Sequence, residues 1–452
     1  MPRDVFLLVN SDFYVIGDSP DIFQLSIYAN KLVFPSFDVI GGSSGDLQPN
    51  QKYKTKQTII YFNIYIRTGG IMEIYVVKEA DTVDKIAGRF GINVESVIYD
   101  NQLVYPYELA IGQALLIDNG ETREDKRSGV FRGFAYPFIS KYVLNETMPS
   151  LSELAVFSYG FTGEGNLIYP KLDDEFMIEA AKNYRALPIL TLTPFDESGR
   201  FSNELISEVI NNGQAVTNLI NQLVDIMTSK GFEGIDIDFE YIKAEDREAF
   251  VEFVRQVTLA MHEVGVTVSV DLAPKTSADQ PGLLYEGKDY RALGEIADSV
   301  LVMTYEWGYT YGPPMAVAPI NKVRQVLDYA VTEIFSEKIN MGIPNYGYDW
   351  PLPFVQGTTK AKTIGNVEAV RIAIENNVVI EFDKTAMSPY FRYMDNGVEH
   401  EVWFEDARSI QAKLELIYEY NLRGASYWQI MQLFINNWLL IDYNFSVVKN
   451  EI

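Results

Sequence analysis

Three carboxylic acids alternate with apolar residues in the stretch "GFEGIDIDFEYI", residues 231–242. They are Asp236, Asp238 and Glu240. Because a β-strand alternates its side chains between two faces, the three acids share one face, at steps of roughly 6–7 Å. Like charges held this close resist simultaneous ionisation, so at least one acid should keep its proton near neutral pH. A retained proton is what a general acid needs.

The residues between the acids indicate the surroundings of this strand. Ile235, Ile237 and Phe239 suit a face that packs beneath helices, as in a parallel α/β sheet or barrel. The acids must then line a polar interior or a cleft. A metal site is the alternative for clustered acids, but adjacent carboxylates on one strand without other evident ligands chelate poorly. We therefore expect no metal and no cofactor.

Composition narrows the chemistry to carboxylates. The chain has 452 residues, a net charge of −25 and a pI near 4.5, which argues against binding to nucleic acid or to an anionic membrane. It contains no cysteine, hence no disulfide, thiolate nucleophile or Cys-ligated metal. The two histidines, His262 and His400, belong to no HExxH pattern, and we expect them to be structural or solvated.

No segment predicts membrane insertion or export by the Sec route. The start, "MPRDVFLLVNSDF", has acids on both sides of a five-residue apolar run. The run "TIIYFNIYI", residues 58–66, is shorter than the about 20 residues that a membrane span needs. The glycines of "GGSSGD", residues 41–46, lack the Gly-Lys-Ser/Thr ending of a phosphate loop and predict a turn.

The C-terminal two thirds of the chain predicts a (β/α)₈ barrel. Eight apolar, β-rich runs alternate with amphipathic helices: "FRGFAY", "LAVFSYGF", "LPILTLTP", "GFEGIDIDFE", "VTVSVDLAP", "DSVLVMTYE", "INMGIPNYG" and "GASYWQI". In such a barrel the active site lies at the C-terminal ends of the strands, where Glu240, Tyr305 and Trp428 are found. The seventh connection is too long for a loop, so residues 348–403 are predicted to form a small α+β insertion.

Other parts precede the barrel. Residues 72–118 predict a compact βααβ unit, in which Val83, Ile86, Ala87 and Phe90 give the first helix an apolar stripe. Residues 119–129 carry mixed charges without apolar periodicity and predict a linker to a barrel over 130–445. Residues 1–71 are an extension for which the sequence predicts no function.

The βααβ unit resembles a LysM module, the carbohydrate-binding repeat that recognises N-acetylglucosamine-containing glycans. The resemblance rests on "YVVKEADTVDKIAGRFGI", "DNQL" and "IGQALLI". One departure is Ala80, where the family usually has glycine. A generic βααβ fold without a ligand is the alternative.

The barrel resembles glycoside hydrolase family 18, the chitinase-like barrels. "EGIDIDFE" resembles the family's DxxDxDxE signature on strand four, with Glu233 in place of the first aspartate. "MTYE" resembles Met-x-Tyr-Asp on strand six, and "SYWQ" brings Trp428 to the floor-tryptophan position on strand eight. Stretches such as "PNYGYDWPLP", "LAPKTSADQPG" and "WFEDARSIQAK" are most similar to the bacterial spore-associated group, the peptidoglycan N-acetylglucosaminidases with LysM modules before the barrel.

The resemblance implies a retaining glycosidase in which the substrate's 2-acetamido group acts as the nucleophile. Glu240 would then protonate the leaving oxygen, Asp238 would orient the acetamido N–H, and Asp236 would share a proton with Asp238. Tyr305 would hold the acetamido oxygen and Trp428 would form the floor beneath the sugar. Further aromatic residues are candidate walls of the substrate groove: Trp307, Tyr309, Tyr346 and Trp350.

The implied partner is peptidoglycan or another N-acetylglucosamine polymer, and the implied location is the spore or cell wall, for a protein that we expect to be a monomer. A chitinase or an endo-N-acetylglucosaminidase acting on other glycans would use the same chemistry. A non-catalytic chitinase-like lectin is a third hypothesis. Such lectins usually lose the acid, and the presence of Glu240 with both aspartates argues against this one.

Overall fold

The computed structural model describes residues 72–120, 123, 126–195 and 200–450, together with four short strands in the N-terminal extension. The chain divides into two units, Met1–Arg67 and Thr68–Ile452. In the first unit the strands form two antiparallel pairs: β1 (Val5–Val9) with β2 (Asp12–Ile16), and β3 (Ile27–Tyr28) with β4 (Lys31–Leu32). The rest of the extension lies outside the described residues.

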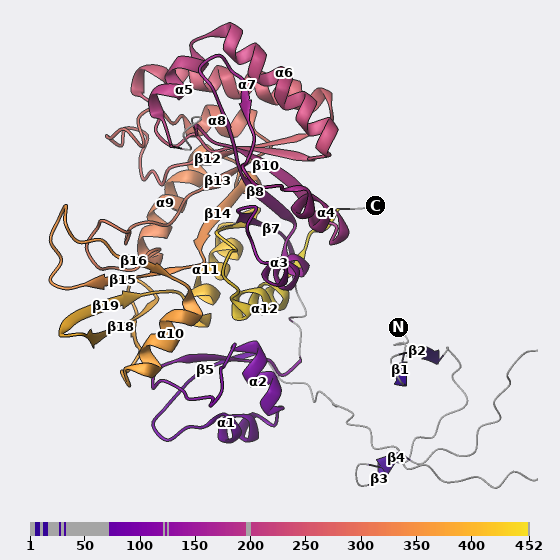
Figure 1. The fold of residues 1–452 in the computed structure, drawn as a ribbon, viewed down its shortest axis with the longest axis vertical. Helices are drawn as coiled ribbons and strands as arrows, with labels where there is room; N and C mark the ends of the chain where they lie inside the picture. The colour runs from indigo at the N-terminus through magenta and orange to yellow at the C-terminus, as the bar shows by residue number, and fades with distance from the viewer. Residues whose placement is uncertain are drawn as a thin grey trace, which may run out of the picture. The chain divides into compact units, whose positions relative to one another are not determined.

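Eight parallel strands form a closed barrel in the second unit (Figure 1). Each strand pairs with the next, and the last pairs with the first to close the ring. In order they are β7 (Arg127–Ala135), β8 (Glu153–Phe161), β10 (Leu187–Leu192), β11 (Gly234–Ile237), β12 (Thr267–Leu272), β13 (Ser299–Val302), β14 (Ile339–Pro344) and β20 (Gly424–Trp428). The (β/α)₈ fold that the alternating pattern predicts is confirmed.

Helices cover the outside of the barrel, and their buried faces form one continuous apolar core with the outward side chains of the strands. They are α3 (Lys141–Thr147), α4 (Glu175–Asn183), α5 (Asn203–Ile210), α6 (Gly213–Lys230), α7 (Arg247–Glu263), α8 (Tyr290–Ile296), α9 (Ile320–Glu333), α11 (Ala407–Glu419) and α12 (Ile435–Asn444). Short 3₁₀ turns precede α7 and follow α3 and α9: η2 (Ala244–Asp246), η1 (Met148–Ser150) and η3 (Ser336–Lys338). Among the described helices, none has the length and apolarity to cross a bilayer.

The chain enters the acid-bearing strand β11 from a helix that ends sharply. Asn212 caps the start of α6, and Gly231 ends it with φ +73°, in the left-handed region that glycine adopts without strain. Phe239 then stacks on Phe253 and packs at a tilt against Phe250, both on α7, on the outer face of the strand. The expected division of the segment into an apolar outer face and an acidic inner face is therefore present.

The connection after β14 contains the expected α+β insertion. Five antiparallel strands lie in the order β16-β15-β19-β18-β17, with one helix beside them. The elements are β15 (Gly347–Pro351), β16 (Lys362–Ile364), α10 (Asn366–Glu375), β17 (Glu381–Asp383), β18 (Ser388–Asp395) and β19 (Val398–Trp403). Val402, Phe391 and Phe404 help to form its own small core.

The N-terminal part of the second unit is the predicted βααβ unit. Strand β5 (Glu73–Val76) pairs antiparallel with β6 (Ala114–Ile117), and α1 (Val83–Phe90) and α2 (Val94–Asp100) pack against this pair. The turn before α1 has Ala80 at φ +65°, where a glycine would carry no strain. The departure from the family pattern therefore leaves the turn conformation in place but strains it.

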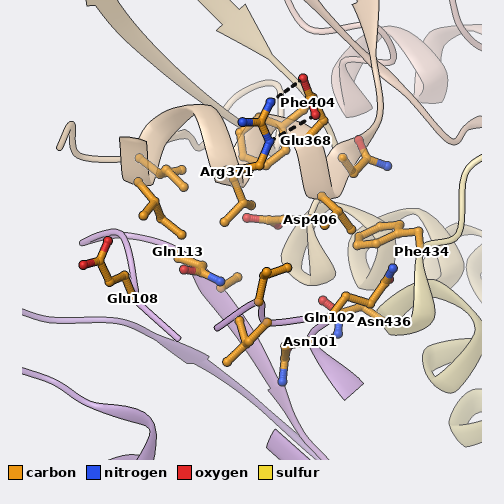
Figure 2. A pocket seen from close by; sticks show the side chains of 18 of the residues that line it. Asn101, Gln102, Glu108, Gln113, Glu368, Arg371, Phe404, Asp406, Phe434 and Asn436 are labelled. Carbon is orange, nitrogen blue, oxygen red and sulfur yellow. Dashed lines mark hydrogen bonds and ion pairs between the residues drawn. The ribbon is translucent and has the colours of Figure 1, made fainter. Parts of the chain in front are cut away.

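The module contacts both the insertion and the C-terminal helix α12. Gln102 donates to the main-chain oxygen of Leu433 at 3.1 Å, and Asn436 donates to that of Asp100 at 2.7 Å. The amide of Ile380 donates to Ile111 of the module. Figure 2 shows the cavity of about 310 Å³ that remains between these parts, with Gln113 and Glu108 on the side of the module and Arg371 on α10.

The segment predicted as a linker, residues 119–129, overlaps the barrel. Strand β7 begins at Arg127, and its first three residues pair with β21 (Phe445–Val447) at the C-terminal end of the described chain. A second short strand, β9 (Leu167–Ile168), folds back onto β8. The pairing with β21 joins residues over 300 positions apart, so no local pattern in the linker could have indicated it.

Candidate active site

Asp236 lies deepest of the three acids and is ion-paired. Its Oδ1 accepts hydrogen bonds from Arg132 of β7, at 2.5 Å, and from the hydroxyl of Ser269 on the neighbouring strand β12. Arg132 also donates to Glu153 of β8 at 2.7 Å. Because all four residues are buried, the guanidinium supplies a permanent positive charge inside the barrel. No motif in the sequence marks Arg132 as a partner of these acids.

Asp238 lies one step further along β11 and is also buried. Its amide donates to Leu192 of β10 at 3.0 Å, which extends the strand ladder past Ile237. Burial, followed by the negative charges of Glu240 and Asp236, raises the pKa of Asp238 well above its usual range. This carboxyl group is therefore poised to hold or release a proton as its surroundings change.

Glu240 is the outermost acid and is only half-buried. Burial raises its pKa above the usual range, while the positive charge of Lys288 opposes this shift and the negative charge of Glu306 adds to it. A glutamate that keeps its proton to a higher pH at the open end of the row can act as a general acid.

Two further buried groups, one acidic and one basic, lie beside the three acids. Asp271 of β12 follows Val270, the residue that pairs with Ile237, so its carboxyl group lies beside the inner face of β11. Lys288, between β12 and α8, donates from Nζ to the main-chain oxygen of Asp271 at 2.8 Å. The stretch "VSVDLAP" carried the signal for Asp271, since Ser269 and Asp271 alternate with valines just as the acids of β11 alternate with isoleucines.

Tyr305 and Trp428 come from other strands, two and four places around the barrel from β11. Tyr305 follows β13, is half-buried, and packs its ring against Gly342 of β14. Burial and the charges of Asp271 and Asp238 raise the pKa of its hydroxyl, which therefore remains a proton donor. Trp428, at the end of β20, is half-buried and meets Phe157 edge-on at a centroid distance of 4.7 Å.

The four aromatic residues expected to line the groove differ in exposure. Tyr309 is 42% exposed and Trp307 is half-buried, so both present surface to a ligand. Tyr346 is almost closed off, and its hydroxyl donates to Glu306. Trp350 is 0% exposed, and its Nε1 donates to the main-chain oxygen of Gly312 at 2.8 Å. Trp350 lies on β15 of the insertion and packs in one apolar cluster with Ala316 and Val317, so it has no surface in this structure on which a sugar could lie.

An aromatic pocket of about 290 Å³ lies beside Trp428, over the ends of β7 and β8. Tyr136 contacts Trp428 at a centroid distance of 6.1 Å and stacks on Phe138 at 5.2 Å. Phe138 and Tyr169 are 64% and 54% exposed. The sequence analysis did not select these residues, although Tyr136 directly follows the first barrel strand.

The histidines and acids elsewhere form no metal centre in the parts that the structure describes. No group of three or more His, Cys, Asp or Glu side chains in those residues could hold a metal ion. His262 contacts Asp298 at 2.9 Å and His400 contacts Asp349 at 2.7 Å.

Comparisons with known proteins agree with this geometry. The model of the glycosyl hydrolases family 18 matches residues 198–432, and the LysM domain model matches residues 75–118. The cortical fragment-lytic enzyme of Bacillus subtilis (strain 168) is 38% identical over 430 residues, which cover 84% of this chain and 99% of that protein. The enzyme of the same name from Bacillus cereus is 38% identical over 432 residues, covering 84% of this chain and 100% of the relative.

A solved structure superposes on most of this chain. The spore cortex-lytic enzyme SleL of Bacillus megaterium QM B1551 superposes with a TM-score of 0.79 at 36% sequence identity. The match covers 84% of this chain and 100% of that structure.

Proposed function

The chain belongs to the glycosyl hydrolases family 18, and we propose that it hydrolyses N-acetylglucosamine-containing strands of spore cortex peptidoglycan with retention of configuration. The observation that carries the proposal is the row of acids on β11. Its outermost member, Glu240, is half-buried with a raised pKa, while Asp236 and Asp238 behind it are buried. The names of the relatives, a cortical fragment-lytic enzyme and a spore cortex-lytic enzyme, support this substrate class.

The first step needs one protein acid and the substrate's own nucleophile. Glu240 donates its proton to the glycosidic oxygen as the carbon–oxygen bond breaks. The acetamido oxygen of the same sugar attacks the anomeric carbon and closes an oxazolinium ring. Asp238 accepts a hydrogen bond from the acetamido N–H and, once ionised, stabilises the positive charge of this ring. The hydroxyl of Tyr305 donates a hydrogen bond to the acetamido oxygen.

The second step reverses these proton movements. Glu240, now ionised, removes a proton from a water molecule that attacks the anomeric carbon, and the acetamide reopens. Trp428 offers an apolar ring face beneath the sugar, against which carbohydrate C–H groups pack well. Arg132 pairs with Oδ1 of Asp236, and Oδ2 of Asp236 is buried with no hydrogen-bond partner among the described residues, so this oxygen is free for the proton that Asp236 would share with Asp238.

The LysM domain supplies a second contact with the same polymer. We propose that residues 75–118 bind N-acetylglucosamine units of insoluble peptidoglycan and keep the protein at the spore cortex or cell wall. Residues 1–71 have no place in this proposal. Removal of these residues should leave turnover of soluble fragments unchanged.

The test of the proposal is the variant Glu240→Gln, which removes the proton but keeps the shape of the side chain. Turnover of purified cortex fragments should fall by about 10²–10⁴-fold, with glycan binding and thermal unfolding unchanged. Glu245→Gln, an exposed glutamate on η2, is the matched control and should retain full turnover. Near-normal turnover by Glu240→Gln would disprove the assignment.

The alternative functions can be distinguished by the products that the enzyme releases from different glycans. Mass spectrometry of fragments released from spore cortex, compared with release from chitin oligomers and glycoprotein glycans, distinguishes a cortex enzyme from a chitinase or an endo-N-acetylglucosaminidase. Binding of these glycans without any cleavage would indicate the lectin hypothesis instead.

A further inference from the structure

Lys288 is a fully buried lysine next to the active-site acids, and the mechanism above does not use it. The residue is 0% exposed. Its Nζ donates to the main-chain oxygen of Asp271 at 2.8 Å and stands 5.0 Å from the centroid of the Phe250 ring. Lysine is almost never fully buried unless it is paired with an opposite charge, so the surroundings of this ammonium group should contain one.

Acids on or beside two strands supply that charge without direct contact, because among the described residues no carboxylate forms an ion pair with Lys288 within 4.0 Å. Asp238, Asp271, Glu240 and Asp236 all stabilise the protonated form of Lys288 electrostatically. In the part of the chain that the structure describes, Asp238 Oδ1 and Asp271 Oδ1 are buried and accept no hydrogen bond. A negative charge on either carboxylate therefore depends on nearby cations more than on local hydrogen-bond donors.

The other cations of the barrel interior already have partners. Arg132 bridges Glu153 and Asp236, and Arg423 donates to Glu153 at 2.6 Å. These two guanidinium groups balance the charges of two carboxylates. Among the interior cations that the structure describes, Lys288 then remains for the other three acids.

We propose that Lys288 is a positioning residue that holds one negative charge on the Asp238–Asp271 pair while Glu240 keeps its proton. The proposal rests on the proposed function, in which Glu240 must start protonated and Asp238 must be ionised when the oxazolinium ring forms. Lys288 touches no substrate in this proposal; it acts through the charge of Asp238.

The electrostatics of the cluster agree with this geometry. Burial lowers the pKa of Lys288 to about 8, so the ammonium form predominates below that pH. Its positive charge lowers the pKa of Asp238, Asp271 and Glu240, against the larger effect of burial. Removing the charge must therefore raise all three values, and both limbs of the pH profile of turnover should move to higher pH.

Other groups around the pair do not replace this effect. Arg132 on β7 also lowers the pKa of Asp271, but it is engaged with Asp236 and is present in every variant. Tyr305, just after β13, is near the pair and has a neutral hydroxyl. Lys275, on the same connection as Lys288, directs its Nζ to the main-chain oxygen of Lys288 at 3.1 Å.

The experiment compares variants that separate charge from packing. Lys288→Gln keeps an N–H donor for the oxygen of Asp271 but removes the charge, Lys288→Met removes both, and Lys288→Arg keeps the charge. Lys275→Met is the matched control, because it removes another buried lysine that bonds only to a main-chain oxygen. The measurement is kcat/KM against pH on soluble cortex fragments, with thermal unfolding as the check of folding.

The two neutral variants should shift both limbs of the profile upward by about one pH unit, which is about a tenfold loss of kcat/KM on the acid limb. Lys288→Arg should restore the wild-type limbs, and Lys275→Met should lower stability without moving them. A profile of Lys288→Gln that is lower but unshifted would overturn the proposal. An equal shift in Lys275→Met would also overturn it.

A second readout does not depend on turnover. Carboxyl ¹³C NMR titration of wild type and Lys288→Gln should show buried carboxyl groups that titrate about one unit higher in the variant. Identical titrations would refute the charge effect even if the wild type cleaved none of the glycans. That absence of cleavage would refute the proposed function instead, so the two failures are distinguishable.

Discussion

Gly342 on β14 leaves the space in which the ring of Tyr305 lies, and a single methyl group there should displace the tyrosine. A Cβ at this position would meet Tyr305 Cε1 at 2.6 Å, Tyr305 Cδ1 at 2.9 Å and the main-chain oxygen of Val302 at 3.0 Å. Carbon atoms pack at about 3.5–4.0 Å, so the ring must move by about 1 Å. The main-chain oxygen of Val302, which is also close, further restricts the methyl group.

The magnitude of the effect follows from this displacement. A misplacement of about 1 Å can cost about 10²-fold in rate, and overpacking a core typically costs about 1–3 kcal/mol. Gly342→Ala should therefore lower kcat by about 100-fold, with a smaller change in KM and a measurable loss of stability. The assay is steady-state turnover of soluble cortex fragments, together with thermal unfolding.

Two comparisons make the test specific. Gly88→Ala in α1 places the same methyl group in open space and should leave kcat unchanged. If the effect passes through the hydroxyl of Tyr305, then adding Gly342→Ala to Tyr305→Phe should cause little further loss. Wild-type kcat in Gly342→Ala, or full additivity with Tyr305→Phe, would refute the position assigned to this hydroxyl.

Three further predictions concern charge and backbone strain. Arg132→Met should destabilise the protein by about 3–5 kcal/mol in denaturant unfolding, because Glu153 and Asp236 lose a buried partner; a change below 1 kcal/mol would contradict the buried network. Ala80→Gly should stabilise the LysM domain by about 1 kcal/mol, because it removes the strain of a left-handed alanine, and a lower Tm would disprove this. The pKa of Asp271 is raised in the folded protein, so the folded state binds more protons at this group than the unfolded state does. The contribution of Asp271 to folding stability therefore falls as the pH rises from its unfolded pKa, near 4, towards its folded pKa. The Tm advantage of Asp271→Asn over wild type should therefore grow with pH across this window, and a constant difference would contradict the buried charge.

The sequence predicted the features that depend on local periodicity. The alternation of acids and apolar residues placed Asp236, Asp238 and Glu240 on one inner face, because a strand has a period of two whatever it pairs with. The eight apolar runs predicted the barrel for a different local reason, since a parallel strand buried on both faces is apolar along its length. The residues at the strand ends, Tyr305 and Trp428, then followed from the working face of such a barrel.

Features that depend on contacts between distant segments could not be predicted in this way. Arg132 is 104 positions from Asp236 in the sequence, and nothing in "FRGFAY" indicates its partner. Trp350 lies near the active-site end of the barrel, but the packing of the insertion decides that it is buried. The start of β7 at Arg127 depends on β21, the last strand of the barrel region.

The central claim is that the substrate's acetamido group, and no protein carboxylate, attacks the anomeric carbon. The most direct measurement compares the turnover of one defined cortex oligosaccharide in two forms, fully N-acetylated and de-N-acetylated at the sugar whose glycosidic bond is cleaved. The account predicts that the de-N-acetylated form still binds but is not cleaved, because it lacks the acetamido oxygen that attacks the anomeric carbon. Comparable turnover of the two forms would contradict substrate assistance and would require a second carboxylate as the nucleophile.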